Sequence, residues 1–529
     1  MTQTPPQALP PRTDVVGVVG AGLMGRGITQ IAAQAGFEVR LIDARPGAAS
    51  DARRAIADVL EGLASKGRIQ ADDARRAVAR IALPDTLDGL AGCTIVVEAI
   101  VEKLDAKQAL FRELEAVVGE RCILATNTSS LPVTAIASVC ARPDRVAGLH
   151  FFSPVPLMKL VEVIAGLLTA PAVEQQLVDF GAALGHTPVC ARDTPGFIVN
   201  HAGRGYGTEA LRIVSEGIAD HATIDRILKR AAGFRMGPFE LFDLTGLDVS
   251  HPVMESIYRQ YYEEPRFRPS PITAQRLSAG LLGRKSGRGF YDYGETGAGA
   301  AAPPAAYAAE GTSNGKPAGT PAATAAPAAH VWLGPAEAST RDALATLLSA
   351  LGVRVDGGAK PAPDALCVVL PLGRDATSEA LAHGLDARRT VALDSLFGFD
   401  RQRTLMTTPV TDAATRDAAR SLFAADGVPV ETIRDSPGFV AQRVIAHIVN
   451  VACEIAQQRI AAPADIDLAV RLGLAYPMGP LAWGDALGPL RILGILQALY
   501  ETYGDPRYRP SVWLSRRARL GVSLLTPDA

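Results

Sequence analysis

The sequence predicts an α/β fold: a Rossmann-type, doubly wound parallel sheet, then an all-α domain, a small degenerate α/β unit and a second copy of the all-α domain. Two observations support this prediction. Short strand-like runs alternate with amphipathic helical stretches from residue 14 to about residue 166, a pattern typical of parallel strands joined by crossover helices. A helical segment then recurs 242 positions further along the chain, which indicates an internal duplication.

The strands of the first sheet are expected to be short and rich in β-branched residues. The predicted strands are 15–20, 38–43, 94–99, 122–126, 146–152 and 160–164. Residues 48–80 form a longer excursion than one crossover needs, so we expect a helical hairpin there. Residues 172–289 read as helical. The later α/β unit offers strands at 331–333, 367–370 and 391–394.

A glycine-rich turn follows the first strand, where residues 20–25 read Gly-Ala-Gly-Leu-Met-Gly. Gly20 allows the tight turn, Gly22 lets backbone N–H groups approach a pyrophosphate, and Gly25 lets the next helix pack closely on the strand. The N-terminus of that helix then presents its partial positive charge to the phosphates. The turn therefore predicts a dinucleotide site, with a purely structural tight turn as the alternative.

Asp43 ends the second predicted strand, where a carboxylate can accept hydrogen bonds from an adenosine ribose. Because an anionic side chain repels a 2′-phosphate, the residue favours NAD over NADP. Arg45 lies two residues further on and could hold that phosphate, so the choice between the two cofactors stays open at this point.

The composition of the 529 residues is that of an ordinary soluble protein with about three or four domains. Lys and Arg number 53 and Asp and Glu number 55, so no general attraction for nucleic acid or an anionic membrane is expected. The six cysteines are scattered without metal-ligand spacing. We therefore expect buried free thiols, no metal and a cytoplasmic location.

The domain boundaries follow from shifts in composition. Residues 295–330 are nearly all Ala, Gly, Pro and Thr, which bury too little surface to offset their ordering entropy. The predicted parts are a disordered tail 1–13, an NAD-binding domain 14–192, a helical domain 193–294, a flexible linker 295–330, a small α/β unit 331–409 without a phosphate loop, and a second helical copy 410–529.

Two stretches show the duplication. Asp-Thr-Pro-Gly-Phe-Ile-Val-Asn at 193–200 returns as Asp-Ser-Pro-Gly-Phe-Val-Ala-Gln at 435–442, and Met-Gly-Pro at 236–238 returns at 478–480. Both are displaced by 242 residues, so the copies align without a gap between these points. The helical domain is therefore present twice, whereas the dinucleotide unit is intact only once.

His150 and Glu162 form the candidate catalytic pair, because they are symmetric about Pro156 and would face each other if the flanking strands form a hairpin. A carboxylate on one imidazole nitrogen fixes the tautomer and leaves the other nitrogen as a general base. The alternative is a histidine that merely fills the core. However, Glu162 lies in an apolar run, and an unpaired buried carboxylate costs several kcal/mol.

Two polar residues could assist this pair. Ser129 lies on a loop after a predicted strand and could hydrogen-bond the oxygen of an alcohol as it becomes a carbonyl; otherwise it caps a helix. Asn200 lies just inside the next predicted helix and could be a routine first-turn residue. Its repeat carries Gln442, which is compatible with a polar role kept in one copy only.

These motifs together resemble the L-3-hydroxyacyl-CoA dehydrogenase family, in particular its long bacterial members tied to phenylacetate degradation, which act on 3-hydroxyadipyl-CoA or 3-hydroxybutyryl-CoA. The matching stretches are residues 20–25, Val-Val-Glu-Ala-Ile-Val-Glu at 96–102, Asn-Thr-Ser-Ser-Leu at 127–131, the block 148–162, the segment 193–200, and Gly-Arg-Lys-Ser-Gly at 283–287.

The resemblance implies NAD as the cofactor and an acyl-CoA thioester as the substrate, whose 3-hydroxyl group is oxidised. It implies His150 and Glu162 as the catalytic dyad, with Ser129 and Asn200 at the substrate hydroxyl and thioester and Lys66 at the CoA moiety. The implied cofactor-binding residues are Gly20, Gly22, Leu23, Met24, Gly25, Asp43, Glu98, Lys103, Asn127, Ser129, Ser153 and Lys285. One departure is Ser153, where the family usually has Asn.

Two further hypotheses are a dehydrogenase of a non-CoA hydroxyacid and a non-catalytic NAD-binding protein. A free carboxylate at the far end of the acyl chain would need a cation, for which Arg204, Arg235 and Arg284 are candidates. In two-domain members of the family the helical domain is the dimer contact. We therefore expect either a monomer with an internal pseudo-dimer of helical copies or a homodimer.

Overall fold

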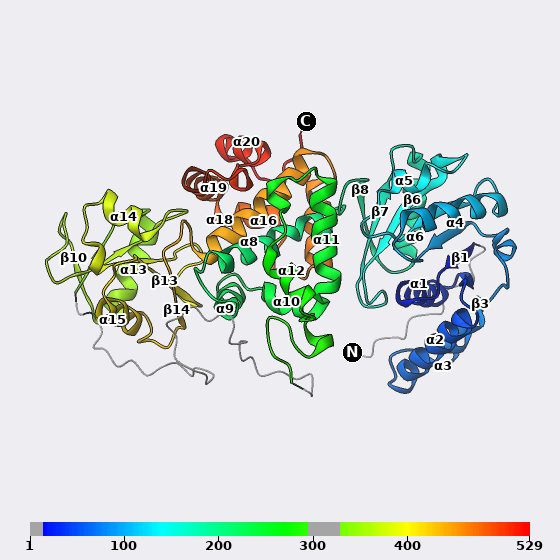
Figure 1. Cartoon of the computed structure of the whole chain (residues 1–529), viewed down its shortest axis with the longest axis horizontal. Coiled ribbons are helices and arrows are strands. Elements are labelled where there is room, and N and C mark those ends of the chain that lie inside the picture. The colour runs from blue at the N-terminus through cyan, green and yellow to red at the C-terminus, as the bar shows by residue number, and fades with distance from the viewer. Residues whose placement is uncertain (1–13, 295–327, 329, 529) are drawn as a thin grey trace, which may run out of the picture. The chain divides into compact units, whose positions relative to one another are not determined.

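The computed structural model describes residues 14–294, 328 and 330–528, which form two compact units (Figure 1). The first unit contains the described residues up to His201 together with Gln458–Leu474. The second unit contains Ala202–Gln457 and the residues from Ala475 onward. The predicted tail 1–13 and nearly all of the predicted linker 295–330 lie outside the described residues.

The first unit is built on an eight-stranded sheet in the order β3-β2-β1-β4-β5-β6-β7-β8. The strands are β1 (Val15–Val19), β2 (Glu38–Ile42), β3 (Ile81–Ala82), β4 (Ile95–Glu98), β5 (Ile123–Thr126), β6 (Val146–Phe151), β7 (Leu160–Ala165) and β8 (Thr187–Arg192). All six predicted strands are present to within one residue at either end. The prediction missed β3, which is very short, and β8, which lies in the stretch expected to be helical.

One pair of strands departs from the predicted parallel sheet. β6 and β7 are antiparallel, and β8 is parallel to β7, so the last two strands run opposite to the rest. The connection between Phe151 and Leu160 is too short for a crossover, which a parallel pair would need. The predicted hairpin itself is confirmed, with His150 directly opposite Glu162 in the register.

Helices cover this sheet and extend from it. They are α1 (Leu23–Gln34), α2 (Ala48–Ser65), α3 (Ala71–Ala79), α4 (Leu104–Val117), α5 (Val133–Ala137) and α6 (Pro171–Ala183). The expected helical hairpin is confirmed in α2 and α3, which lie side by side (Figure 1). Its buried face, including Ile56 and Leu60, joins the core formed by α1 and the first strands.

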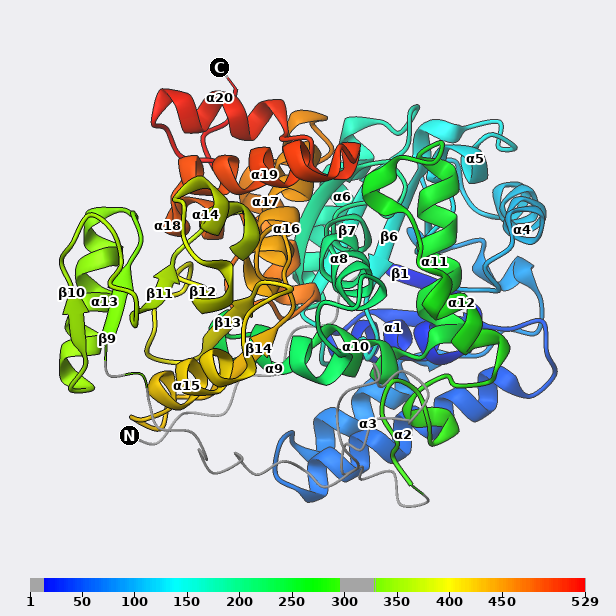
Figure 2. The same cartoon turned by 60° about the vertical axis from the view of Figure 1, so that its left-hand side comes forward.

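The helical domain is present twice, as predicted. The first copy contains α8 (Arg204–Ser215), α9 (His221–Ala231), α10 (Pro238–Thr245), α11 (Leu247–Gln260) and α12 (Pro271–Ser278). The second contains α16 (Val440–Gln457), α17 (Pro463–Gly473), α18 (Pro480–Leu487), α19 (Pro489–Tyr503) and α20 (Val512–Leu520). In the second unit α16 is buried along almost its whole length and packs against α8, α18, α19 and α20 (Figure 2).

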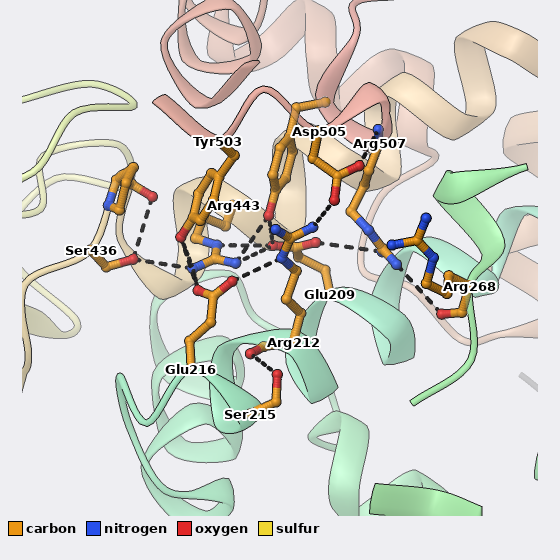
Figure 3. A network of polar contacts seen from close by, with 12 residues as sticks. Glu209, Arg212, Ser215, Glu216, Arg268, Ser436, Arg443, Tyr503, Asp505 and Arg507 are labelled. Atoms are coloured by element: carbon orange, nitrogen blue, oxygen red, sulfur yellow. Dashed lines mark hydrogen bonds and ion pairs between the residues drawn. The ribbon is translucent and has the colours of Figure 1, made fainter. Parts of the chain in front are cut away.

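A buried polar network joins α8 and α16 (Figure 3). The guanidinium of Arg443 is fully buried and binds Glu209 at 2.8 Å and Glu216 at 2.6 Å. The hydroxyl of Tyr508 donates to Glu209 at 2.7 Å. Burial alone would raise the pKa of Glu209, but the charges of Arg443 and Arg507 outweigh it and lower that pKa to about 2. The two helical copies are thus joined by a buried carboxylate that stays ionised because arginines surround it.

The second unit also contains a six-stranded sheet in the order β10-β9-β11-β12-β13-β14. Its strands are β9 (His330–Leu333), β10 (Arg354–Asp356), β11 (Leu366–Val369), β12 (Thr390–Leu393), β13 (Arg403–Thr407) and β14 (Val430–Ile433). The three predicted strands are present within one residue, and the other three were not predicted. Because α15 (Ala413–Phe423) and β14 belong to this sheet unit, the boundary expected at residue 410 is wrong, and the helical copy begins near Val440.

Candidate active site

His150 and Glu162 are held against each other by two adjacent strands. Their side chains project from opposite positions of β6 and β7, and Nδ1 of His150 lies 2.6 Å from Oε2 of Glu162. The histidine is 5% exposed and the glutamate 0% exposed, so solvent screens their interaction little. Because Nδ1 is engaged by the carboxylate, Nε2 is the ring nitrogen left to exchange a proton with another group.

The second oxygen of Glu162 is fixed as firmly as the first. Oε1 accepts the backbone N–H groups of Ile198 at 3.0 Å and Val199 at 2.9 Å. The chain reaches this geometry through Gly196 and Phe197, both with positive φ, just before α7 (Val199–Ala202). A positive φ at Phe197 is uncommon for a residue with a side chain, so this turn is strained in order to aim two donors at one carboxylate.

Ser129 lies on the loop after β5, where Glu102, a residue that was not predicted to have a role, holds the polar groups together. Glu102 accepts hydrogen bonds from the Ser129 N–H at 2.8 Å and from the Thr128 hydroxyl at 2.7 Å, and it also bonds Ser130. Burial alone would raise the pKa of Glu102, but the charge of Lys107 and these bonds lower it. Its place in the motif 96–102 is the signal that marks it.

Asn200 connects this loop with His150 and Glu162. Its Nδ2 donates to the carbonyl of Ser129 at 3.4 Å, and it directly follows Val199, whose N–H binds Glu162. The structure therefore links four predicted residues through one set of contacts in the first unit. They are His150, Glu162, Ser129 and Asn200.

The glycine-rich turn has the shape that a dinucleotide requires. A Cβ on Gly20 would lie 2.5 Å from the carbonyl oxygen of Ala99, and one on Gly25 would overlap the carbonyl of Gly20. A Cβ on Gly22 would meet nothing within 4 Å, so this residue borders open space. The N-terminus of α1 has no side-chain cap, which leaves its first turn suited to a phosphate. The residues present therefore fit an NAD pyrophosphate.

Asp43 lies beside this turn. Its Oδ2 accepts the N–H of Ala21 at 2.7 Å, and its Oδ1 lies 3.2 Å from Nε of Arg45. Partial burial would raise the pKa of Asp43, but hydrogen bonds from Ala21 and Arg45 outweigh it and lower that pKa. The side chain is therefore an ionised acceptor at the end of β2. Arg45 is engaged with this carboxylate.

Two other residues implied as cofactor contacts support the strands from within. Glu98 is fully buried and binds Lys107 at 2.5 Å and the Thr126 hydroxyl at 2.7 Å. Asn127 accepts the N–H of Phe151 at 2.9 Å, which ties the end of β5 to the end of β6. These contacts hold together the ends of β4, β5 and β6, and His150 lies near the end of β6.

The remaining predicted residues lie at the surface or in the other unit. Leu23, Lys66, Lys103 and Ser153 are exposed in the first unit, and Met24 is half-buried. Lys285 lies in the second unit, where its ammonium group is 2.5 Å from Asp248. Of the candidate arginines, Arg235 is exposed, Arg284 lies over the ring of Tyr293, and Arg204 is half-buried.

The second sheet carries the same positions with different chemistry. Thr404 lies 242 residues after Glu162. The backbone N–H of Asp394 donates to the carbonyl of Thr404, so Asp394 faces Thr404 as His150 faces Glu162 in the first sheet. The carboxylate of Asp394 accepts a hydrogen bond from Gln442 at 2.9 Å, and Gln442 also accepts the N–H of Gly373. In the described part of this hairpin, Asp394 and not a histidine stands opposite Thr404.

Comparisons with known proteins match both parts of the chain. The model of the NAD binding domain of 3-hydroxyacyl-CoA dehydrogenase matches residues 15–194, and that of the C-terminal domain matches 196–293 and 438–523. The 3-hydroxyadipyl-CoA dehydrogenase of Escherichia coli K12 is 37% identical over 507 residues, covering 96% of this chain and 97% of that protein. A probable 3-hydroxybutyryl-CoA dehydrogenase of Bacillus subtilis is 41% identical over 278 residues, which are 53% of this chain and 96% of that protein.

A solved structure shows the same architecture over nearly the full length. The crystal structure of 3-hydroxybutyryl-CoA dehydrogenase from Escherichia coli K12 superposes with a TM-score of 0.80 at 35% identity. It covers 96% of this chain and 99% of that chain. Among the described residues no helix is both long enough and apolar enough to traverse a bilayer.

Proposed function

The chain belongs to the 3-hydroxyacyl-CoA dehydrogenase family and is an NAD-dependent oxidoreductase, and from this premise we propose that His150 and Glu162 carry out its proton transfer. The substrate is an L-3-hydroxyacyl-CoA, which becomes the 3-oxoacyl-CoA. The single observation that supports this assignment is the 2.6 Å contact between Nδ1 of His150 and Oε2 of Glu162 inside the first unit.

Oxidation of a secondary alcohol removes a proton from oxygen and a hydride from carbon. Bound NAD supplies the hydride acceptor. Nε2 of His150 takes the hydroxyl proton as a general base. Two backbone donors hold the carboxylate of Glu162, so it does not have to reorient when its charge stabilises the imidazolium. Ser129 and Asn200 position the oxygen as it becomes a carbonyl.

The residues that would hold NAD are those of the turn and of the end of β2. The uncapped N-terminus of α1 would receive the pyrophosphate, with Gly22 leaving room for it. Asp43 would accept hydrogen bonds from the adenosine ribose. Because its carboxylate is ionised and would repel a 2′-phosphate, NAD is favoured over NADP. Glu98 and Asn127 would act through the strand ends that they fix.

The acyl chain is proposed to be short or medium, with 3-hydroxyadipyl-CoA and 3-hydroxybutyryl-CoA as the leading substrates. The similarity to a 3-hydroxyadipyl-CoA dehydrogenase over nearly the full length favours the former. An adipyl chain ends in a carboxylate, which requires a cation. Arg204 is our candidate for that role because it is half-buried and follows Asn200 by four residues in the sequence.

The test measures NADH formation with each of these two thioesters and with the matching free acids. We expect turnover of the thioesters and little with the free acids, since Lys66 is proposed to meet the CoA moiety. His150→Gln is expected to lower kcat by about 10²–10⁴, the usual range for one acid–base residue. Full turnover by His150→Gln would exclude the proposed role, and preference for a free acid would favour the hydroxyacid alternative.

We also propose a cytoplasmic monomer in which the two helical copies form an internal pseudo-dimer. The packing of α8 on α16 within the second unit supports this assembly. Light scattering on the purified chain should give a mass near 55.4 kDa. Twice that mass would favour the homodimer instead.

A further inference from the structure

The first unit contains a helix that comes from the far end of the chain. Residues Gln458–Leu474, which include α17, join the first unit, whereas the rest of the second helical copy belongs to the second unit. α17 packs against β7 and β8. Its buried face includes Ile466, Ala469 and Val470, each 0% exposed. This segment therefore completes the first unit at the edge where the sheet ends.

A backbone hydrogen bond attaches the segment to the edge strand. The N–H of Arg192, the last residue of β8, donates to the carbonyl of Ile460 at 2.8 Å. An edge strand with unpaired backbone groups is normally covered in some way, and here a segment more than 260 residues away in sequence covers it.

The last residue of α17 fits closely against the turn that holds Glu162. A Cβ on Gly473 would lie 2.9 Å from Cγ2 of Val199 and 3.0 Å from Cδ2 of Leu160. Side chains essentially never approach so closely, so any residue larger than glycine must displace a neighbour. Val199 is buried and β-branched, which leaves it little freedom to adjust by rotation.

Val199 connects this contact to the reaction. Its N–H is one of the two donors that fix Oε1 of Glu162, and Asn200 follows it in the chain. A displacement of Val199 would therefore move the anchor of the carboxylate that orients His150, and with it the start of α7. Misplacement of about 1 Å at a catalytic group can cost about a hundredfold in rate.

The other half of the chain has a complementary arrangement of residue sizes. The position equivalent to Gly473, 242 residues earlier, holds Ala231, and the position equivalent to Val199 holds Ala441. Where the turn carries valine the helix carries glycine, and where the turn carries alanine the helix carries alanine. The larger turn residue, Val199, thus goes with the smaller helix residue, Gly473.

We propose that α17 is a positioning element for the catalytic pair, so that the second half of the chain sets the geometry of the single active site through the contact of Gly473 with Val199. This inference rests on the proposed function, because it assigns α17 a role in the same proton transfer. In this proposal Gly473 acts only through Val199 and Glu162.

The test uses the full chain with Gly473→Ala, Gly473→Val and the double variant Gly473→Ala with Val199→Ala, which reproduces the alanine pair of the other half. Gly494→Ala is the matched control, since a Cβ there meets nothing within 4 Å. For each variant, kcat, the KM for NAD and the fraction of chains that bind NAD are measured with the thioester that the unaltered chain turns over best.

We expect Gly473→Val to lower kcat at least about tenfold and Gly473→Ala to lower it less, with the KM for NAD and the NAD-binding fraction unchanged. The double variant should recover most of the kcat lost in Gly473→Ala, and the control should match the unaltered chain. An unchanged kcat in Gly473→Val, or no recovery in the double variant, would overturn the inference.

Two other outcomes are also decisive. If Gly473→Val does not fold, the comparison of Gly473→Ala with the double variant decides the question alone. If the unaltered chain oxidises no 3-hydroxyacyl-CoA, the proposed function fails, and this result is distinct from unaltered turnover in the Gly473 variants.

Discussion

The backbone N–H of Arg192 donates to the carbonyl of Ile460, and this bond joins the last strand of the first sheet to the second helical copy. An equivalent bond joins the other two copies of these positions. The N–H of Arg434, 242 residues after Arg192, donates to the carbonyl of Ile218, 242 residues before Ile460, at 3.0 Å. Each sheet is therefore completed by a segment of the helical copy from the other half. The two halves of the chain thus exchange segments with each other.

The first prediction concerns the catalytic pair as a unit. Glu162→Gln keeps the shape of the side chain but removes the charge that stabilises a protonated His150, so kcat should fall by about 10²-fold or more. Combining it with His150→Gln should cost little beyond His150→Gln alone, because residues that act together are not additive. Steady-state NADH formation measures all three variants, and multiplicative losses would contradict the coupling.

The second prediction concerns the choice of cofactor. Asp43→Ser removes the charged acceptor beside the glycine-rich turn, so the kcat/KM for NAD should fall about tenfold to a hundredfold. The kcat/KM for NADP should fall less or rise, because the repulsion of a 2′-phosphate is removed as well. Parallel assays with the two cofactors give the ratio. An unchanged ratio would show that Asp43 does not contact the ribose.

The third prediction concerns the substrate. Arg204→Leu should lower kcat/KM for 3-hydroxyadipyl-CoA about tenfold or more and leave that for 3-hydroxybutyryl-CoA within about threefold, because only the former ends in a carboxylate. Arg235→Leu is the control, since Arg235 is exposed. Equal losses on both substrates would assign Arg204 a structural role.

The fourth prediction concerns the network of Figure 3. Arg443→Met leaves Glu209 buried without its main counter-charge, which typically costs about 3–5 kcal/mol. Thermal unfolding should detect this as a fall of roughly 10 °C in Tm. The double variant with Glu209→Gln should lose less than the sum of the single losses, because the uncompensated charge is removed too. Additive losses would indicate that the two residues are not coupled.

The fifth prediction concerns acid sensitivity. Burial lowers the pKa of His447 to about 3, from about 6.5 in an unfolded chain, and the charges of Arg507 and Arg266 around it act in the same direction, against that of Glu209. A lowered histidine pKa means that the unfolded state binds the proton first, so stability falls as the pH drops from about 6.5 toward 3. His447→Leu should therefore make Tm less dependent on pH in this window. An identical dependence in both proteins would contradict the assignment.

Glu209 adds to the same trend at lower pH. Its pKa of about 2 lies below the ordinary value of 4.5, so its contribution is complete above pH 4.5 and is lost as the pH falls toward 2. The slope of Tm against pH that remains in His447→Leu below pH 4.5 should diminish further in Glu209→Gln.

Local patterns in the sequence were sufficient to predict much of the fold and of the candidate site. The symmetry of His150 and Glu162 about Pro156 was sufficient to predict their pairing, because a hairpin fixes the register of its strands. β8 was missed because it lies in a long stretch that otherwise reads as helical. Its pairing with β7 depends on the sheet already formed, which local propensity does not encode.

Other features depend on contacts between distant segments. Glu102 acts on a loop that begins more than 20 residues later, so its role is visible only once β4 and β5 lie side by side. The boundary near residue 410 was misplaced because the repeat in sequence begins only near Asp435, whereas the second sheet continues to Ile433. No local pattern in the sequence indicates that α17 belongs to the first unit.

The network around Arg443 has an evolutionary meaning. In a symmetric homodimer every substitution appears at both ends of the interface, so a buried charge must find its partner twice. One chain that carries both halves is free of this constraint: Glu209 corresponds to Val451 and Arg443 to His201 in the aligned copies. One end of the interface is therefore ionic, whereas the equivalent positions carry valine and histidine. The two halves of the chain are thus not interchangeable.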